Sequence, residues 1–102
     1  MLYLMLDQTP TQKLAKVGFS NRKVDNRRKS YKSHNPLAIM RSSCAGSKGT
    51  EKKCHKLLFF LGDRIVGTEW AVIPNELFNE LYEKGMGYFL PKQKPIHFLE
   101  QF

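Results

Sequence analysis

The chain has 102 residues, enough for one domain with a modest hydrophobic core and too few for two such domains. Its apolar fraction of 41% and charged fraction of 25% are typical of globular proteins. The net charge is +8. No apolar run approaches the roughly 20 residues that a membrane-spanning helix needs, so we expect no membrane partner.

The N-terminal residues give no targeting signal. Residues 1–6 are apolar, but this stretch is too short for a signal peptide and lacks the basic start of one. We therefore expect a cytoplasmic protein.

The positive charge is concentrated in one part of the chain. Residues 13–56 hold thirteen lysines and arginines against two acids, a net charge of +11, whereas the remaining residues carry a net charge of −3. Nucleic acid is the commonest partner of such a basic segment, and we favour DNA over RNA. The alternative interpretation is a solvated basic face without a partner.

Two cysteines, Cys44 and Cys54, are too few for a disulfide framework, and the chain has no C-x-x-C motif. A zinc site that combines them with His34 and His55 would need ligand spacings that differ from the usual pairs. Free thiols, buried or half-exposed, are the favoured interpretation.

The first part of the chain predicts two strands and a helix. Residues 1–6 predict a central strand buried on both faces, because the run is almost wholly apolar. Residues 7–12 contain Pro10 among turn formers, and residues 13–20 predict a hairpin partner. A helix is expected from about residue 21 to Ser33, ended by an Asn-Pro pair.

The second part predicts a strand, two helices and a tail. Residues 37–40 predict a third strand, and Thr50 is a candidate N-cap for a helix over residues 51–61. Residues 62–64 are expected to form a turn, and a short aromatic segment precedes an expected last helix that starts near Pro74 and ends at Gly85. This order predicts an α+β domain around a small, mostly antiparallel sheet.

Four polar features in the first half of the chain form a candidate site. Tyr3 lies in the first strand, and Lys16 precedes Val17-Gly18 in the second. Two further pairs have a spacing of four, which places both members on one face of a helix: Arg27 with Tyr31, and Glu51 with His55. A phenol, cations and a carboxylate are the groups that a metal-assisted attack on a phosphodiester needs.

The order of these motifs resembles the GIY-YIG nuclease superfamily, and within it a stand-alone phage and bacterial branch. Tyr3 in Leu-Tyr-Leu stands at the tyrosine of the first motif, and Lys16-Val17-Gly18 stands at the second, with lysine in place of the second tyrosine. The remaining matches are Arg27 with Tyr31, Asn35-Pro36, Glu51-Lys52-Lys53-Cys54-His55 and Gly67-Thr68-Glu69-Trp70-Ala71.

The resemblance covers about residues 2–84. It implies a three-stranded antiparallel sheet flanked by helices, a nuclease domain over residues 1–84, and a tail over residues 85–102 that packs on it. It also implies cleavage to a 5′-phosphate and a 3′-hydroxyl.

Each candidate residue has a structural alternative: Tyr3 as a core residue, Lys16 as a strand-surface charge, and Arg27 as one of several solvated helix arginines, with Arg28 as its rival. Glu51 is the expected Mg²⁺ ligand, with Mn²⁺ as a possible substitute, and its alternative is an acid that favours the helix N-terminus. Arg27 and Lys16 would neutralise the phosphate, and Tyr3 or Tyr31 would accept a proton from water. Three interpretations of His55 stay open: a hydrogen bond to Glu51, a contact with the substrate, or a satisfied core histidine. Further nucleic-acid contacts are expected from Gly18, Arg22, Lys23, Arg28, Lys48 and Lys52.

These features predict a Mg²⁺-dependent endonuclease, acting as a monomer that nicks or as a homodimer. A non-catalytic nucleic-acid-binding module on the same fold is the alternative, and replacement of the second tyrosine by Lys16 favours it. A protein-interaction role is a third, weaker possibility.

Overall fold

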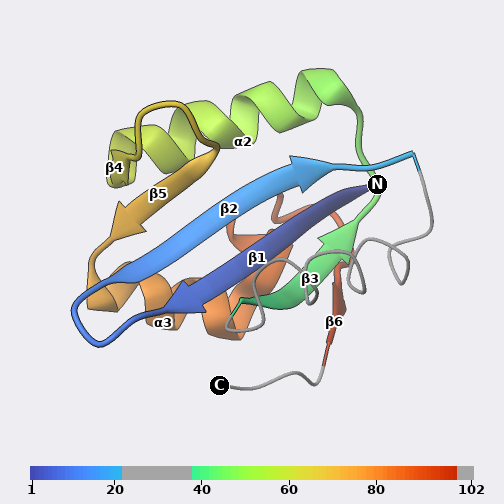
Figure 1. The fold of residues 1–102 in the computed structure, drawn as a ribbon. Coiled ribbons are helices and arrows are strands. Elements are labelled where there is room, and N and C mark those ends of the chain that lie inside the picture. The colour runs from blue at the N-terminus through green and yellow to red at the C-terminus, as the bar shows by residue number, and fades with distance from the viewer. Residues whose placement is uncertain (22–37, 99–102) are drawn as a thin grey trace.

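The computed structural model describes residues 1–21 and 38–98 (Figure 1). The predicted first helix therefore lies mostly outside the described residues, as do five candidate site residues on or near it: Arg22, Lys23, Arg27, Arg28 and Tyr31.

The described part of the chain is an α+β fold with an antiparallel sheet of six strands. The order across the sheet is β4-β5-β2-β1-β3-β6. The bounds are β1 Leu2–Gln8, β2 Lys13–Phe19, β3 Ile39–Cys44, β4 Asp63–Arg64, β5 Trp70–Ile73 and β6 Ile96–His97. Two α-helices follow β3 and β5, namely α2 Lys48–Leu61 and α3 Asn75–Lys84, and a short 3₁₀ helix, η1, spans Gly85–Tyr88.

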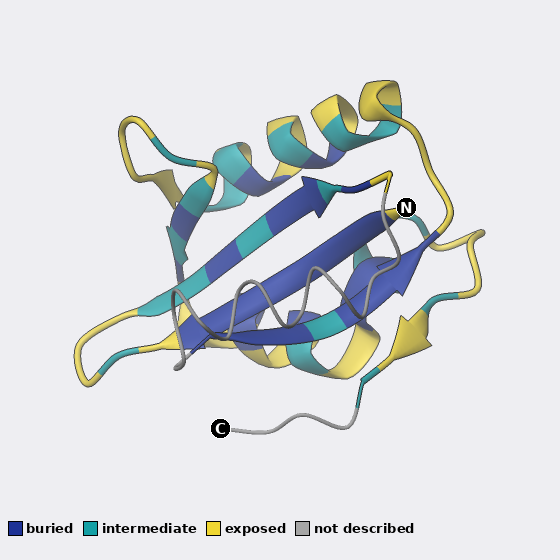
Figure 2. Cartoon of the chain, turned by 45° about the vertical axis from the view of Figure 1, so that its right-hand side comes forward, coloured by how far each residue is buried: buried dark blue, intermediate teal, exposed yellow. Residues whose placement is uncertain are grey.

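The central hairpin forms as its sequence predicts. β1 pairs with β2 from Leu2↔Phe19 to Gln8↔Lys13, and β3 pairs with the other edge of β1. The connecting turn is closed by three hydrogen bonds: the Thr9 amide and the Thr9 hydroxyl donate to the Gln12 carbonyl at 2.9 and 3.2 Å, and the Gln12 amide donates to Thr9 Oγ1 at 2.9 Å. Residues 2–6 of β1 are all buried, as expected for a central strand (Figure 2).

The sheet is larger than the three strands that we expected. β4 and β5 form where the sequence predicted a turn and a short aromatic segment, and β6 forms within the tail. β4 and β6 have two residues each, too short to show the alternation of apolar and polar residues that marks a strand.

The two faces of the sheet bury different residues. One face packs against α2 and α3, and this core combines Leu2, Leu4, Leu6, Ala15 and Val17 from β1 and β2 with Cys54, Leu58, Leu77, Phe78 and Leu81 from the helices. The other face buries a second cluster of Tyr3, Met5, Ala38 and Met40, against which Trp70 and Phe98 pack. Alternate residues of β1 therefore enter different clusters, as strand geometry requires.

Helix α2 begins earlier than predicted. Its N-cap is Ser47 and not Thr50: Ser47 Oγ accepts the amide of Thr50 at 3.3 Å, and the Glu51 amide donates to the Ser47 carbonyl at 2.9 Å. Both residues have a suitable side chain, but Ser47 has the extended backbone that a cap needs. Leu57 is 37% exposed, because Cys54 and Leu58 occupy the buried side of the helix.

Residues 85–98 contact the rest of the fold through buried Met86, through the pairing of β6 with β3, and through a hydrogen bond from Arg41. Gly85 has a φ of 58°, which favours glycine at the end of a helix. Arg41 on β3 donates from Nε to the Tyr82 carbonyl at 2.6 Å and from Nη1 to the Phe98 carbonyl at 2.9 Å. No helix among the described residues is long and apolar enough to span a membrane.

Candidate functional site at the outer edge of β2

The pairing of β2 with β5 ends partway along β2. Its last pair is Lys16↔Trp70, so the β5 ladder does not extend to Val17. Helix α2 reaches this position instead, and His55 Nε2 lies 2.6 Å from the Val17 carbonyl oxygen. Because a carbonyl oxygen can only accept, Nε2 carries the proton in this bond, and in a neutral imidazole Nδ1 then keeps its lone pair.

Three potential metal ligands meet at this edge. Glu51 and His55 lie one turn apart on α2 and are half-buried, and Glu69, the residue before β5, is exposed. One ligand atom from each side chain lies within 4.8 Å of the others. Two atoms bound to one cation at about 2.1 Å are at most about 4.2 Å apart, so a small side-chain movement would bring all three onto one ion.

A partly buried cation borders this cluster. Lys16 Nζ lies 3.6 Å from Glu69 Oε2, and the Lys16 side chain is only 12% exposed. Since the Glu69 side chain is 47% exposed, solvent screening limits the ion pair to about 1 kcal/mol or less. The ammonium of Lys16 also offsets the repulsion between the two nearby carboxylates.

Tyr3 is positioned by the glycine opposite it. The two residues are Cα partners in the β1–β2 ladder. A Cβ atom at Gly18 would overlap the Tyr3 ring at Cζ and Oη and would lie 2.8 Å from Cε2, so a side chain at 18 would displace the phenol. Tyr3 is 1% exposed, so the structure covers its hydroxyl.

The structure thus brings Lys16, Glu51 and His55 to one edge and places Tyr3 on a neighbouring strand. Lys48 and Lys52 are exposed on α2, where they extend the positive charge along the helix.

Sequence reasoning missed Glu69 as a site residue. We treated it only as part of the Gly-x-Glu-Trp motif and interpreted that segment structurally. The motif itself was the only available signal, and it places Glu69 beside Lys16 only once the pairing of β5 with β2 is known.

Both cysteines are free and buried, which agrees with the thiol interpretation. Burial raises the pKa of the Cys44 thiol. Burial, together with the charges of Cys44 and Glu51, raises the pKa of Cys54 to about 11. Both thiols are therefore protonated near neutral pH.

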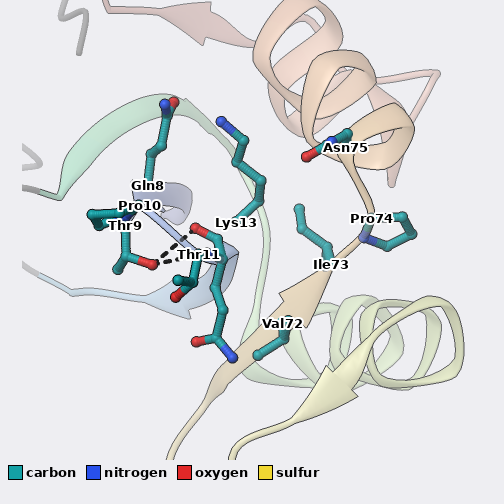
Figure 3. Close-up of a pocket in the computed structure, with 10 residues that line it drawn as sticks. Gln8, Thr9, Pro10, Thr11, Lys13, Val72, Ile73, Pro74 and Asn75 are labelled. Atoms are coloured by element: carbon teal, nitrogen blue, oxygen red, sulfur yellow. Dashed lines mark hydrogen bonds between the residues drawn. The ribbon is translucent and has the colours of Figure 1, made fainter.

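A pocket of about 480 Å³ lies at the other end of β2, between the β1–β2 turn and the start of α3 (Figure 3). Its lining holds no acid or histidine: Gln8, Thr9, Pro10, Thr11, Gln12, Lys13, Val72, Ile73, Pro74 and Asn75. The charged group of Lys13 is engaged elsewhere, since its Nζ lies 4.9 Å from the centre of the Phe78 ring. This pocket lacks the groups that metal-assisted hydrolysis needs.

Comparisons with family models, with curated proteins and with solved structures found no match for this chain. The resemblance to GIY-YIG nucleases therefore stays a prediction from the sequence motifs.

Proposed function

We propose that the chain is a metal-dependent endonuclease of the GIY-YIG type that hydrolyses phosphodiester bonds, with DNA the favoured substrate. One observation carries the proposal: Glu51, His55 and Glu69 offer ligand atoms within 4.8 Å of one another, beside the partly buried ammonium of Lys16. A carboxylate-rich centre next to a fixed cation suits an anionic substrate bound through a metal ion.

The surrounding charge supports a polyanionic substrate. Residues 13–56 carry a net charge of +11, and Glu51 is one of only two acids among them. Lys48 and Lys52 are exposed on the same helix as Glu51, so a phosphate backbone that contacts α2 would pass close to the carboxylates.

Each residue has a role in this proposal. Glu51 holds the cation, and Lys16 and Arg27 neutralise the phosphate as charge develops in the transition state. A bound divalent cation would supply Lewis acidity and lower the pKa of coordinated water. Tyr31 is the favoured proton acceptor, because Tyr3 is 1% exposed. Tyr3 instead packs over Gly18 of β2, the strand that also carries Lys16.

The second candidate is a non-catalytic nucleic-acid-binding module. The burial of Tyr3 favours it, because a covered phenol cannot reach water without a local rearrangement. The basic segment alone would account for binding, and the acids at the β2 edge would then have no catalytic role.

Nicking of supercoiled plasmid distinguishes the two candidates. We expect the chain to convert plasmid to the open-circular form in Mg²⁺ or Mn²⁺ and not in EDTA. Binding to the plasmid with no cleavage of DNA or RNA in either metal would support the binding module and refute the nuclease.

A further inference from the structure

The geometry points to His55 and Glu69 as direct ligands that join Glu51 in a three-residue centre, and this centre prefers first-row transition-metal ions to Mg²⁺. The inference rests on the proposed metal site and deepens it, because the sequence assigned Glu51 alone as the ligand and Mg²⁺ as the ion.

The orientation of His55 is the first step of the argument. Nε2 donates to the Val17 carbonyl at 2.6 Å, at the point where β5 no longer covers the edge of β2. Metal-binding histidines commonly donate the second ring N–H to a backbone carbonyl, which fixes the tautomer and the ring orientation. The same bond here leaves Nδ1 as the nitrogen with a lone pair.

Packing also holds the imidazole ring in place. The centre of the Phe59 ring, one turn further along α2, lies 5.4 Å from that of His55, and His55 is half-buried. A ring held by a backbone bond and an aromatic neighbour loses little freedom when it binds a cation, so the site is preorganised.

Glu69 completes the donor set from a different element. It lies directly before β5, whose first residue pairs with Lys16, and its carboxylate lies within 4.8 Å of the ligand atoms of Glu51 and His55 on α2. Glu69 also forms an ion pair with Lys16 at 3.6 Å. Because Lys16 lies on the same edge of the sheet, this ion pair keeps the Glu69 carboxylate close to Glu51 and His55.

The ligand set of one imidazole nitrogen and two carboxylates determines which metal ion the centre prefers. Mg²⁺ favours oxygen ligands and keeps several waters, whereas imidazole nitrogen suits later divalent ions. The general order of affinity for such ligands places Co²⁺ above Mn²⁺, and the nitrogen donor places both above Mg²⁺.

Calorimetric titration of the full chain with CoCl₂, MnCl₂ and MgCl₂, without nucleic acid, tests this assignment. We expect one Co²⁺ per chain, bound at least about tenfold more tightly than Mg²⁺, and Co²⁺ absorption bands in the visible range that respond to the loss of a ligand. Equal affinity for Co²⁺ and Mg²⁺ would overturn the inference.

Two variants test the ligands, and a third serves as the control. His55→Gln keeps an N–H donor for Val17 but lacks imidazole, and we expect it to weaken Co²⁺ at least about tenfold while changing Mg²⁺ little. Glu69→Gln should weaken Co²⁺ and shift its absorption, whereas Glu83→Gln, on an exposed acid of α3, should change neither.

The melting temperature of each metal-free variant is measured in parallel, so that loss of folding is not mistaken for loss of a ligand. Unchanged Co²⁺ affinity in a folded His55→Gln or Glu69→Gln variant would contradict the assignment of that residue.

Failure of this inference is separable from failure of the proposed function. Plasmid nicking in Mg²⁺ without any Co²⁺ preference would leave the nuclease intact and remove the three-ligand centre. Co²⁺ binding lost in His55→Gln, with no cleavage by the wild-type chain, would keep the centre and remove the nuclease.

Discussion

Gly18 and Tyr3 show how a single residue position shapes the β2 edge. The sequence predicted Gly18 as a nucleic-acid contact. In the structure the space above Gly18 is filled by the Tyr3 ring, and both residues are buried. The glycine is therefore required by a neighbouring side chain, which no local pattern in the sequence could have indicated.

We expect Gly18→Ala to lower the free energy of unfolding by about 1–3 kcal/mol, because the new methyl group overpacks a ring that has no room to move. Urea unfolding measures the change. Gly49→Ala is the matched control, since a Cβ there meets only Ser47 Oγ at 3.7 Å, and it should leave stability unchanged or slightly raised. Equal effects of the two substitutions would show that the Tyr3 ring can yield.

The candidate residues illustrate what residue patterns can supply. The spacing of four between Glu51 and His55 placed both on one helix face, and the structure puts them in one cluster. Glu69 is fourteen residues beyond His55 along the chain. It joins them through strand pairing, so its position could not follow from spacing.

At the scale of elements, the start of helix α2 fixes the position of Glu51. Ser47 caps the helix, and the Glu51 amide donates a hydrogen bond to the Ser47 carbonyl. A frayed first turn would move Glu51 while leaving His55 attached to Val17, so the cap contributes to the geometry of the cluster.

Ser47→Ala should lower the free energy of unfolding by about 0.5–2 kcal/mol, because the Thr50 amide loses its acceptor. Thermal unfolding followed by circular dichroism measures it. Ser47→Asp retains an acceptor and should preserve the stability of the wild-type chain. Equal loss in both variants would indicate that the cap is not what stabilises this end.

The long elements could be predicted and the short ones could not. β1 is an almost wholly apolar run, β2, α2 and α3 also carry hydrophobic patterns, and all four form close to their expected places. β4, β5 and β6 have two to four residues and depend on a partner strand for their backbone hydrogen bonds. Tertiary pairing, and not local preference, decides such segments.

At the scale of the whole molecule, topology assembles the site. The sheet order places β5 beside β2, and α2 crosses the same edge (Figure 1). Residues from three separate parts of the chain thereby meet at the β2 edge: Lys16 from β2, Glu51 and His55 from α2, and Glu69 from the segment before β5. The sequence predicted the class of fold and the basic segment, but the edge at which the acids gather depends on a strand pairing that only the structure reveals.

The central claim is that Glu51 holds a metal ion for catalysis and is not needed for binding. The most direct measurement compares plasmid nicking in Mn²⁺ with DNA affinity in EDTA for the wild type, Glu51→Gln and the control Glu83→Gln.

We predict that Glu51→Gln loses nicking by a hundredfold or more, on the order of 3 kcal/mol. It should bind DNA as tightly as the wild type or more tightly, because a carboxylate repels phosphate when no cation lies between them. Glu83→Gln should match the wild type in both assays. Two results would contradict the role of Glu51 as a catalytic metal ligand. One is nicking that survives in Glu51→Gln, and the other is a loss of nicking that is matched by an equal loss of DNA affinity.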